Sequence, residues 1–538
     1  MMTRWAHRSP RGPGLTTHMD MAQTRRTWGA ALVGTLVVAG ATSIGATNAS
    51  AASFRTASSV GTTLTIALAQ YPPSLDPASG QNAYSDYFDL AYDPLIVKEP
   101  NGAFEPRLAK AWSYGPDNES FSITLRSGVK FSDGSALTAE AVKAWIKHEV
   151  AFPGGAGAGY FKSLSAIDIT GPLSLTMHFS APTPELELVF SQVLEMGEIG
   201  SPSAITGNKL TTATDGTGEY MLEASQTVTG ETYTYVPNPY YWDPAAVHWK
   251  TVVIKVITNP SAALAALETG QVDVAEVQPI TNAAAAKAAG LKVNAPLTLY
   301  MALALENRNA KPLSSLLVRQ ALNYAVNRSA IAKLLGSGYG LPIDEMAVPG
   351  DDSYDPALAN YYRYDPDKAK QLLAEAGYPH GFTLPVLSLA AAQQNTLAEA
   401  LQGQLASVGV TLQPDITSSV DQYETDISGT TYSAVTLSWG RLPAVTQYQI
   451  LWGPDGQSSR PFHSNSPELD GIYNKLIAAP PSQVAAFAQS MQKFLVEQAW
   501  YLPVAATPLA GFYRADITGV NATPQRNTDY DVEFAPAS

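Results

Sequence analysis

The stretch from residue 251 to residue 277 constrains the fold more than any other part of the sequence. A nearly continuous apolar run, Val252 to Ile257, is followed by the Ala-rich segment Ser261–Glu268, by Gly270, and by a second apolar run, Val272–Val277. A continuous apolar run is expected of a strand buried on both faces, and an Ala-rich segment closed by glycine is expected of a helix. Strand, helix and strand in succession form the unit of an α/β sheet.

Other segments predict the same kind of elements elsewhere in the chain. The apolar positions alternate as in half-buried strands at 64–68, 121–125 and 174–179, and helices are expected to begin at Thr138, Asp365-Pro366 and Ser466-Pro467, where a capping residue precedes an apolar stripe. With 538 residues the chain has room for about three to four domains. No internal repeat of the length found in solenoids is visible. The sequence therefore predicts a multidomain α/β protein.

Charge and cysteine content exclude several classes of function. The chain has 33 basic and 47 acidic residues, a formal net charge of -14, whereas nucleic-acid binding requires an excess of Lys and Arg. It contains no cysteine, which excludes disulfides, thiolate nucleophiles, Cys-ligated zinc, iron–sulfur clusters and a lipid-modified cysteine.

The first 51 residues are predicted to be a signal peptide. Five arginines precede an apolar run from Trp28 to Val38, and the segment ends in Ala49-Ser50-Ala51, an A-x-A cleavage signal. An uncleaved anchor is the alternative, although the apolar run is shorter than the ~20 residues that span a bilayer. Arg25-Arg26 leaves both twin-arginine and ordinary export open. We expect an exported chain in a periplasm or cell-wall space that is not lipid-anchored through cysteine.

The sequence lacks the common catalytic and phosphate-binding motifs. The segment Pro153–Gly159 is rich in glycine, but no Lys follows it as a phosphate loop requires, so we interpret it as a loop. The acid pairs Glu185/Glu187 and Asp351-Asp352 are more typical of solvated faces or turns than of acid–base pairs. No local spacing indicates a metal site or another cofactor. A secreted hydrolase with scattered carboxylates remains an alternative, but we expect no enzyme.

An ordered series of segments resembles family 5 of the extracytoplasmic solute-binding proteins, the dipeptide/oligopeptide/nickel type that delivers cargo to ABC importers. The segment at 216–220 is similar to the family's G-T-G-P-Y, with Glu219 in place of proline. The other matching segments follow one another along the chain: Tyr92–Leu95, Glu105–Trp112, Leu125–Gly134 running into Leu137–Val142, Asn238–Trp242, Leu267–Asp273, Val318–Arg328, Tyr364–Tyr378 and Ser466–Asp470.

The resemblance implies an α/β, two-lobed periplasmic-binding-protein fold of type II, with an extra small domain inserted in the first lobe. Lobe I would comprise 52–98, 206–298 and 501–538, the inserted domain 99–205, and lobe II 299–500. It implies a monomer that captures a peptide or peptide-sized polar solute between the lobes and delivers it to the permease subunits of an ABC importer. A receptor for a sensor is the alternative to a transport role.

The resemblance also suggests residues that contact the ligand. In peptide-binding relatives a Trp-led loop of lobe II supplies an Asp for the ligand's ammonium. The matching loop here begins at Trp439 and has Leu442 where that Asp would fall, although another acid, such as Asp421 or Asp426, could substitute. Arg441 is a candidate anchor for a ligand oxygen, with a structural ion pair as the alternative.

Trp439 is expected either to stack on the ligand or to pack in the wall. In lobe I, Tyr71, Asn82 and Tyr84 are candidate ligand contacts, with turn formation in this proline-rich loop as the alternative.

Overall fold

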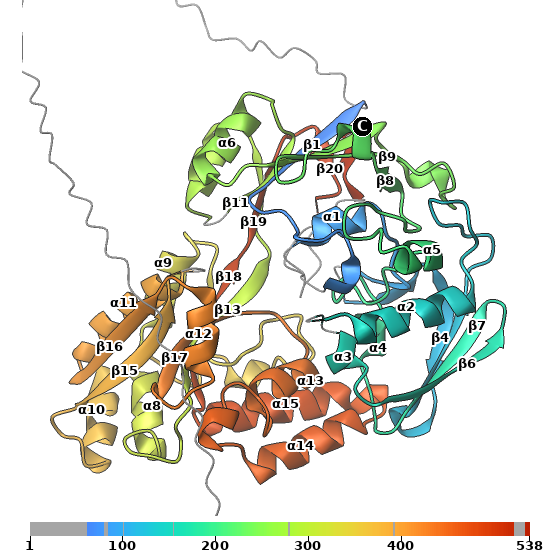
Figure 1. Ribbon diagram of the computed structural model, residues 1–538. Coiled ribbons are helices and arrows are strands. Elements are labelled where there is room, and N and C mark those ends of the chain that lie inside the picture. The colour runs from blue at the N-terminus through green and yellow to red at the C-terminus, as the bar shows by residue number, and fades with distance from the viewer. Residues whose placement is uncertain are drawn as a thin grey trace, which may run out of the picture. The chain divides into compact units, whose positions relative to one another are not determined.

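A computed structural model describes residues 62–79, 84–99, 102–153, 155, 157–277, 280–390, 393–520 and 533–537 (Figure 1). The predicted signal peptide and Asn82 lie outside these residues. Among the described residues no helix combines the length and the apolar character that a membrane crossing requires.

The first sheet has seven strands and contains the unit that the sequence predicts most strongly. Parallel pairing joins its central strand β1 to β10 and to β11. The order is β12-β19-β11-β1-β10-β9-β8. The strands are β1 (Thr63–Leu68), β8 (Tyr220–Leu222), β9 (Thr232–Pro237), β10 (Thr251–Val256), β11 (Val274–Val277), β12 (Lys292–Asn294) and β19 (Ala510–Tyr513). The predicted strand–helix–strand is confirmed as β10, α6 (Pro260–Glu268) and β11.

One expectation for this sheet is wrong. Strand β10 is not buried on both faces: Val252 and Ile254 are fully buried, whereas Val253 and Lys255 are half-exposed. The reason is the placement of the helices. Helices α6 and α7 (Ala283–Ala288) cover Ala67, Ala275 and Phe512 of β1, β11 and β19, and their core cluster contains no residue of β10.

The second sheet has six strands in the order β14-β18-β13-β17-β15-β16. They are β13 (Leu297–Leu305), β14 (Leu341–Pro342), β15 (Phe382–Leu389), β16 (Val410–Thr417), β17 (Ala434–Gly440) and β18 (Tyr501–Pro508). One face packs on α8 (Leu316–Tyr324), α9 (Arg328–Leu335), α10 (Pro366–Glu375) and α11 (Gln394–Ala406). The other packs on α12 (Val420–Ile427), α13 (Ala444–Gln447), α14 (Pro467–Ile477) and α15 (Pro481–Glu497).

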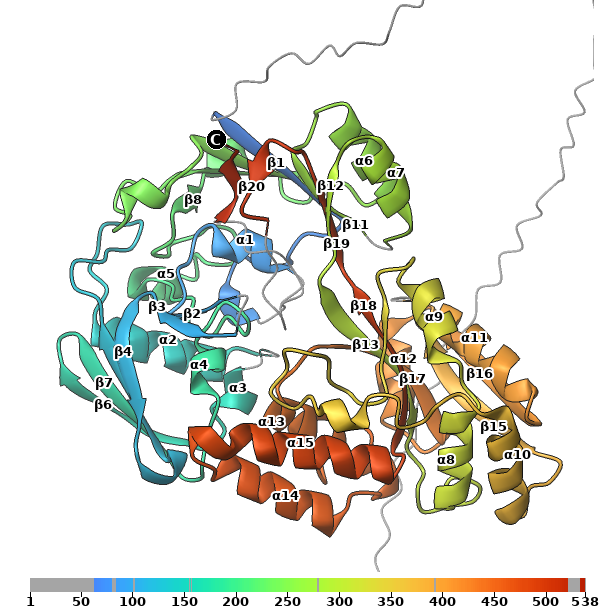
Figure 2. The same cartoon turned by 180° about the vertical axis from the view of Figure 1, so that it is seen from behind.

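Two adjacent chain crossings link the sheets. Strand β12 leads into β13 through Ala295 and Pro296, and β18 leads into β19 through Leu509. Figure 2 shows β13 and β18 side by side as they run toward β12 and β19, and the backbone pairing agrees, with Leu297 opposite Pro508 and Asn294 opposite Gly511. These crossings are short, so the two sheets follow directly on one another along both chain segments.

A four-stranded antiparallel sheet, β4-β5-β7-β6, lies between β1 and β8 in the sequence. Its strands are β4 (Ala109–Tyr114), β5 (Ser120–Leu125), β6 (Leu164–Gly171) and β7 (Ser174–Phe179), and its helices are α2 (Ala139–Ala151), α3 (Gly157–Tyr160), α4 (Leu186–Val189) and α5 (Pro202–Thr206). This part shares one apolar core with the first sheet and with α1 (Ser85–Asp89). The exact domain bounds stay a prediction.

The Gly-rich segment is not wholly a loop, because Gly157 begins α3. A Cβ added at Gly157 would lie 2.6 Å from the backbone oxygen of Glu149, so a side chain here would collide with α2. The glycine therefore serves close helix packing, and no phosphate cradle is needed to explain it.

Candidate functional site

A buried ion pair lies at the end of strand β17, beside the chain crossings that link the two sheets. Arg441, directly after β17, donates from Nε and Nη2 to Oδ1 of Asp351, at 3.2 and 2.5 Å, and from Nη1 to the carbonyl of Leu297 at 2.9 Å. Both side chains are nearly inaccessible, at 6% and 7%. The backbone N–H of Arg441 donates to the carbonyl of Thr298. This geometry is the structural ion pair that the sequence left open, and a ligand contact by Arg441 stays a prediction.

Asp351 also connects the ion pair to β13. It accepts hydrogen bonds from the hydroxyl of Tyr300 and, at 3.0 Å, from the backbone N–H of Val348. Burial, and then the Asp351 charge, hold the pKa of Tyr300 well above its usual value. Trp439 lies opposite Tyr300 in the β13–β17 pair and is half-buried against the core that contains Tyr300. Trp439 thus packs beside the ion pair, as the second of its two predicted roles.

Lys98 approaches the same region from the other half of the molecule. It ends β2 (Ile96–Lys98), which pairs with β3 (Phe104–Pro106), and its backbone is held by Gln192 through bonds of 2.9 and 2.8 Å. Burial lowers the pKa of the Lys98 ammonium, while the charges of Asp352, Glu185 and Asp351 counteract that effect. Arg441 repels the same ammonium.

Glu185, at the start of α4, interacts electrostatically with Lys98. Its backbone is left-handed, with a φ of 66°, and its side chain is half-buried. Burial, followed by the charge of Asp352, raises the pKa of the Glu185 carboxyl to about 8, against the opposing effect of Lys98. The Glu185 charge also acts on Tyr473 of α14, whose ring stacks on Tyr448 with centroids 3.8 Å apart.

We call five of these side chains, Lys98, Glu185, Asp351, Asp352 and Arg441, the interlobe charge cluster. Lys98 and Glu185 come from chain segments that precede the second sheet, and the other three come from segments of the second sheet. A direct contact joins the same two halves: Nδ2 of Asn118 donates to the carbonyls of Ile477 and Ala479, at 3.1 and 3.3 Å, at the end of α14. Charges of both signs therefore meet where the halves meet.

The candidate ligand contacts in lobe I, Tyr71 and Tyr84, are not part of the interlobe charge cluster. Tyr71, in the loop after β1, is 46% exposed and its ring lies beside Gly230, while Tyr84 is half-buried at the start of α1. Within the described residues, no hydrogen bond or ion pair joins either tyrosine to Trp439 or Arg441. Their role as ligand contacts stays a prediction.

The expectation that the acid pairs lie on solvated faces or in turns holds only in part: Asp351 and Asp352 lie in a turn, but three of the four side chains are not solvated. Asp351 is buried in its ion pair, and Glu185 is half-buried and interacts electrostatically with Lys98. Glu187 accepts hydrogen bonds from Nε1 of Trp112 and from the hydroxyl of Tyr114. Only Asp352 is exposed. A sequence shows that acids are adjacent but not that they meet a lysine 250 residues away.

Sequence reasoning also missed Lys98. The only signal was a charged residue at the end of the apolar run Leu95-Ile96-Val97, which is equally common at surface strand ends. For the described part of the chain, His, Asp and Glu side chains form no group of three or more that could hold a metal ion.

Two sheets linked by two adjacent crossings, with charged side chains of both halves meeting beside them, define a two-lobed solute-binding protein. Residues 103–459 match the sequence model of the "Bacterial extracellular solute-binding proteins, family 5 Middle", and the chain belongs to this family. The protein is the substrate-binding component of an ABC importer and acts outside the cytoplasm with permease subunits, as the sequence predicted.

Individual relatives agree with this assignment. The glutathione-binding protein GsiB of Salmonella typhimurium is 26% identical over 488 residues, covering 85% of this chain and 91% of GsiB. Solved structures with the same fold include AgaA of A. tumefaciens R10 with agropinic acid (TM-score 0.72, 22% identity, 88% and 99% covered). Another is DppA of Helicobacter pylori with the peptide STSA (TM-score 0.71, 20% identity, 89% and 99% covered).

Proposed function

We propose that the protein captures a peptide-sized zwitterion in the interlobe charge cluster and releases it to the permease. The observation that carries this proposal is the meeting of unlike charges from both halves. Asp351 is paired with Arg441, and the charges that we propose the ligand meets are the Lys98 ammonium and the exposed Asp352 carboxylate. A ligand carboxylate would pair with Lys98, and a ligand ammonium with Asp352.

This arrangement supplies what the Trp-led loop lacks. Leu442 stands where an acid would meet the ligand's ammonium, and Asp352, exposed beside Glu185, offers a carboxylate from a different loop. Trp439, Arg441, Tyr71 and Tyr84 are proposed as further contacts. The glutathione of GsiB and the peptide of DppA are zwitterions of the proposed size, which supports the proposal.

The proposal includes two negative statements about this chain. It acts as a binder and not as a catalyst, as expected for a family of solute-binding proteins. Since the sequence has no cysteine, it is not lipid-anchored through cysteine.

Calorimetry on the purified protein tests whether binding requires both charges of the ligand. The peptide Ser-Thr-Ser-Ala and glutathione are titrated beside forms in which the amino group is acetylated or the terminal carboxyl is amidated. Each modification should weaken binding by about tenfold or more, since a charge-assisted hydrogen bond contributes about 1.5–3 kcal/mol. Native mass spectrometry of protein purified without denaturation tests for retained cargo with the same two charges.

Variants locate the site. Lys98→Met keeps the length of the side chain and removes its charge, and it should weaken the ligand by about tenfold or more, as should Asp352→Asn. Lys110→Met, at an exposed lysine of β4, is the matched control and should bind as the native protein does. If Lys98→Met and Lys110→Met bind equally well, the cluster is not the ligand site.

A further inference from the structure

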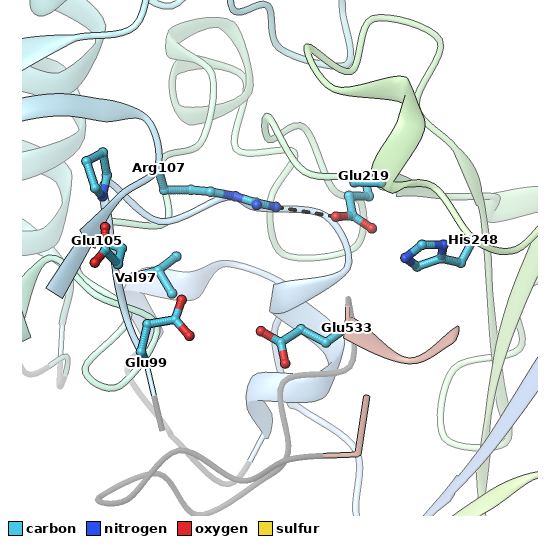
Figure 3. Close-up of a pocket in the computed structure, with 9 residues that line it drawn as sticks. Val97, Glu99, Glu105, Arg107, Glu219, His248 and Glu533 are labelled. Carbon is cyan, nitrogen blue, oxygen red and sulfur yellow. Dashed lines mark hydrogen bonds and ion pairs between the residues drawn. The ribbon is translucent and has the colours of Figure 1, made fainter. Parts of the chain in front are cut away.

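A pocket lies within the first half of the molecule, on the far side of β2 from Lys98. Val97 and Glu99 line it, whereas Lys98 does not, as expected when successive strand residues point to opposite faces. Its volume is about 330 Å³, and Figure 3 shows its side chains around a common space. Among the described residues its lining is Val97, Glu99, Glu105, Pro106, Arg107, Glu219, Ala246, His248 and Glu533.

Glu219 is the residue that marks this pocket as a site. It is only 2% exposed, and its Oε1 accepts hydrogen bonds from Nη2 of Arg107 and from the hydroxyl of Tyr241, both at 3.3 Å. Its Oε2 is buried and has no hydrogen-bond partner among the residues that the structure describes. In Figure 3 the carboxyl lies between Arg107 and His248. A buried acceptor without a donor is costly, which favours a donor supplied by a ligand.

Arg107 does not supply that donor. Its Nε donates to Oδ1 of Asp93 at 2.7 Å, and its Nη2 donates to the hydroxyl of Tyr241 at 2.7 Å. Its charge is therefore shared between two acids, Asp93 and Glu219. Three more carboxylates, those of Glu99, Glu105 and Glu533, line the pocket, against one exposed histidine, His248. Acidic side chains therefore outnumber basic ones among the described lining residues.

The carboxyl of Glu219 is also a departure from the family motif. Glu219 occupies the position of proline in the G-T-G-P-Y segment that this chain otherwise resembles at 216–220. Proline would leave no carboxyl here, so the acceptor comes from a departure from the motif rather than from the scaffold that the motif describes.

We propose that this pocket is a second binding site, for a small alkylguanidinium or alkylammonium ion, with Oε2 of Glu219 as its principal acceptor. The volume suits a cation of a few non-hydrogen atoms, and Val97, Pro106 and Ala246 offer short apolar walls for an alkyl group. A cation with N–H donors satisfies the buried oxygen of Glu219, and the acidic side chains among the described lining residues favour a cation. This inference does not depend on the identity of the solute bound between the lobes.

The site also predicts a coupling to protons. Burial, followed by the charge of Asp93, raises the pKa of Glu219 to about 8, and Arg107 opposes this. A bound cation favours the ionised carboxyl, so binding at pH 7 releases a proton and tightens as the pH rises to 9. The charged or titratable groups that face Glu219 are Asp93, Arg107, Tyr241 and, across the pocket, Glu99, Glu105, His248 and Glu533.

Calorimetry with agmatine, which carries a guanidinium and an ammonium, tests the site on the full chain. Glu219→Gln keeps the shape and the bond to Arg107 but removes the charge, and Glu219→Pro restores the residue of the motif. Both should weaken agmatine by about tenfold or more, while Glu268→Gln, at an exposed glutamate of α6, should not change it. Tetramethylammonium, which has no N–H donor, should bind at least tenfold more weakly than agmatine.

Several results would overturn the proposal. One is the absence of binding at 10 mM agmatine. Another is an agmatine affinity of Glu219→Gln within twofold of that of the native protein. A third is binding of Mg²⁺ as strong as that of agmatine, which would indicate a generic counterion site. An equal loss in Lys98→Met would place agmatine between the lobes instead and would also overturn it. Circular dichroism and thermal melting check that each variant is folded. If Glu219→Pro does not fold, the result for Glu219→Gln alone decides the test.

Discussion

Arg441 and Asp351 form a buried pair whose two members depend on each other. Replacing Arg441 with methionine fills a similar volume but leaves the carboxylate of Asp351, 7% exposed, with a hydroxyl and a backbone N–H as its only donors among the described residues. Removing one partner of a buried ion pair lowers the free energy of unfolding by about 3–5 kcal/mol. We expect a loss of this size for Arg441→Met in urea denaturation, and less than about 0.5 kcal/mol for Arg460→Met, at an exposed arginine.

The same variant separates a structural role of Arg441 from a ligand contact. If the side chain only holds Asp351 and the Leu297 carbonyl, Arg441→Met protein that remains folded should bind its ligand within about twofold of the native affinity. A loss of more than about tenfold, at temperatures where the variant is fully folded, would assign Arg441 a direct ligand contact. A loss of unfolding free energy below about 1 kcal/mol would contradict the buried-pair interpretation.

At the scale of single residues, the sequence identified the types of side chain but not their partners. Trp439 and Arg441 were selected from a local motif, and the structure places both beside Tyr300. What Arg441 contacts depends on Asp351, which lies 90 residues earlier and approaches only because β13 and β17 pair. Lys98 and Asp352 meet through the folding of the whole chain, for which no local pattern exists.

Asn118 links the turn before β5 to the end of α14. Its backbone is left-handed, with a φ of 57°, and its side-chain amide donates to two carbonyls at the helix end, those of Ile477 and Ala479. Asn118→Gly tolerates the same backbone and removes only the amide. Each of the two lost hydrogen bonds is worth about 0.5–1.5 kcal/mol, so ligand affinity should fall by about fivefold to 100-fold if these bonds stabilise the closed arrangement.

A matched control exists in the same chain. Asn208 also has a positive φ, 50°, and is exposed, so Asn208→Gly makes the same chemical change away from α14. Small-angle scattering should report a larger radius of gyration for Asn118→Gly than for Asn208→Gly without ligand. Equal radii and equal affinities would show that the bonds to α14 do not influence closure.

Elements with strong local signals were predictable. Asp365 caps α10, where its Oδ1 accepts from the N–H of Lys368 at 2.9 Å, and Gly377 follows the helix with a φ of 90°, as Pro366 and the apolar stripe indicated. The burial of strand β10 on both faces was predicted wrongly, because an apolar run shows that its side chains can be buried but not that both faces are covered. Which face is covered depends on where α6 and α7 pack, and that is decided by tertiary contacts.

Buried carboxyl groups determine how the stability of the whole molecule responds to pH. Glu219, Glu306 and Glu345 are each 2% exposed or less, and burial raises the pKa of each to about 8. In the unfolded chain the same groups ionise near their ordinary pKa of about 4.3. Between pH 5 and pH 8 the folded protein therefore holds protons that the unfolded chain has released, and the free energy of unfolding falls as the pH rises.

We expect the melting temperature, measured by calorimetry without ligand, to be highest near pH 5, to decrease toward pH 8 and to level off above it. Glu306→Gln should flatten part of this slope, because the amide is neutral at every pH and Glu306 Oε1 has no partner within the described residues. Glu268→Gln, at an exposed position, should keep the native slope. Carboxyls with a lowered pKa, such as that of Asp133, act below this window, where their stabilisation is lost on acidification. A melting temperature that rises from pH 5 to pH 8 would mean that these glutamates are ionised and solvated in the folded protein.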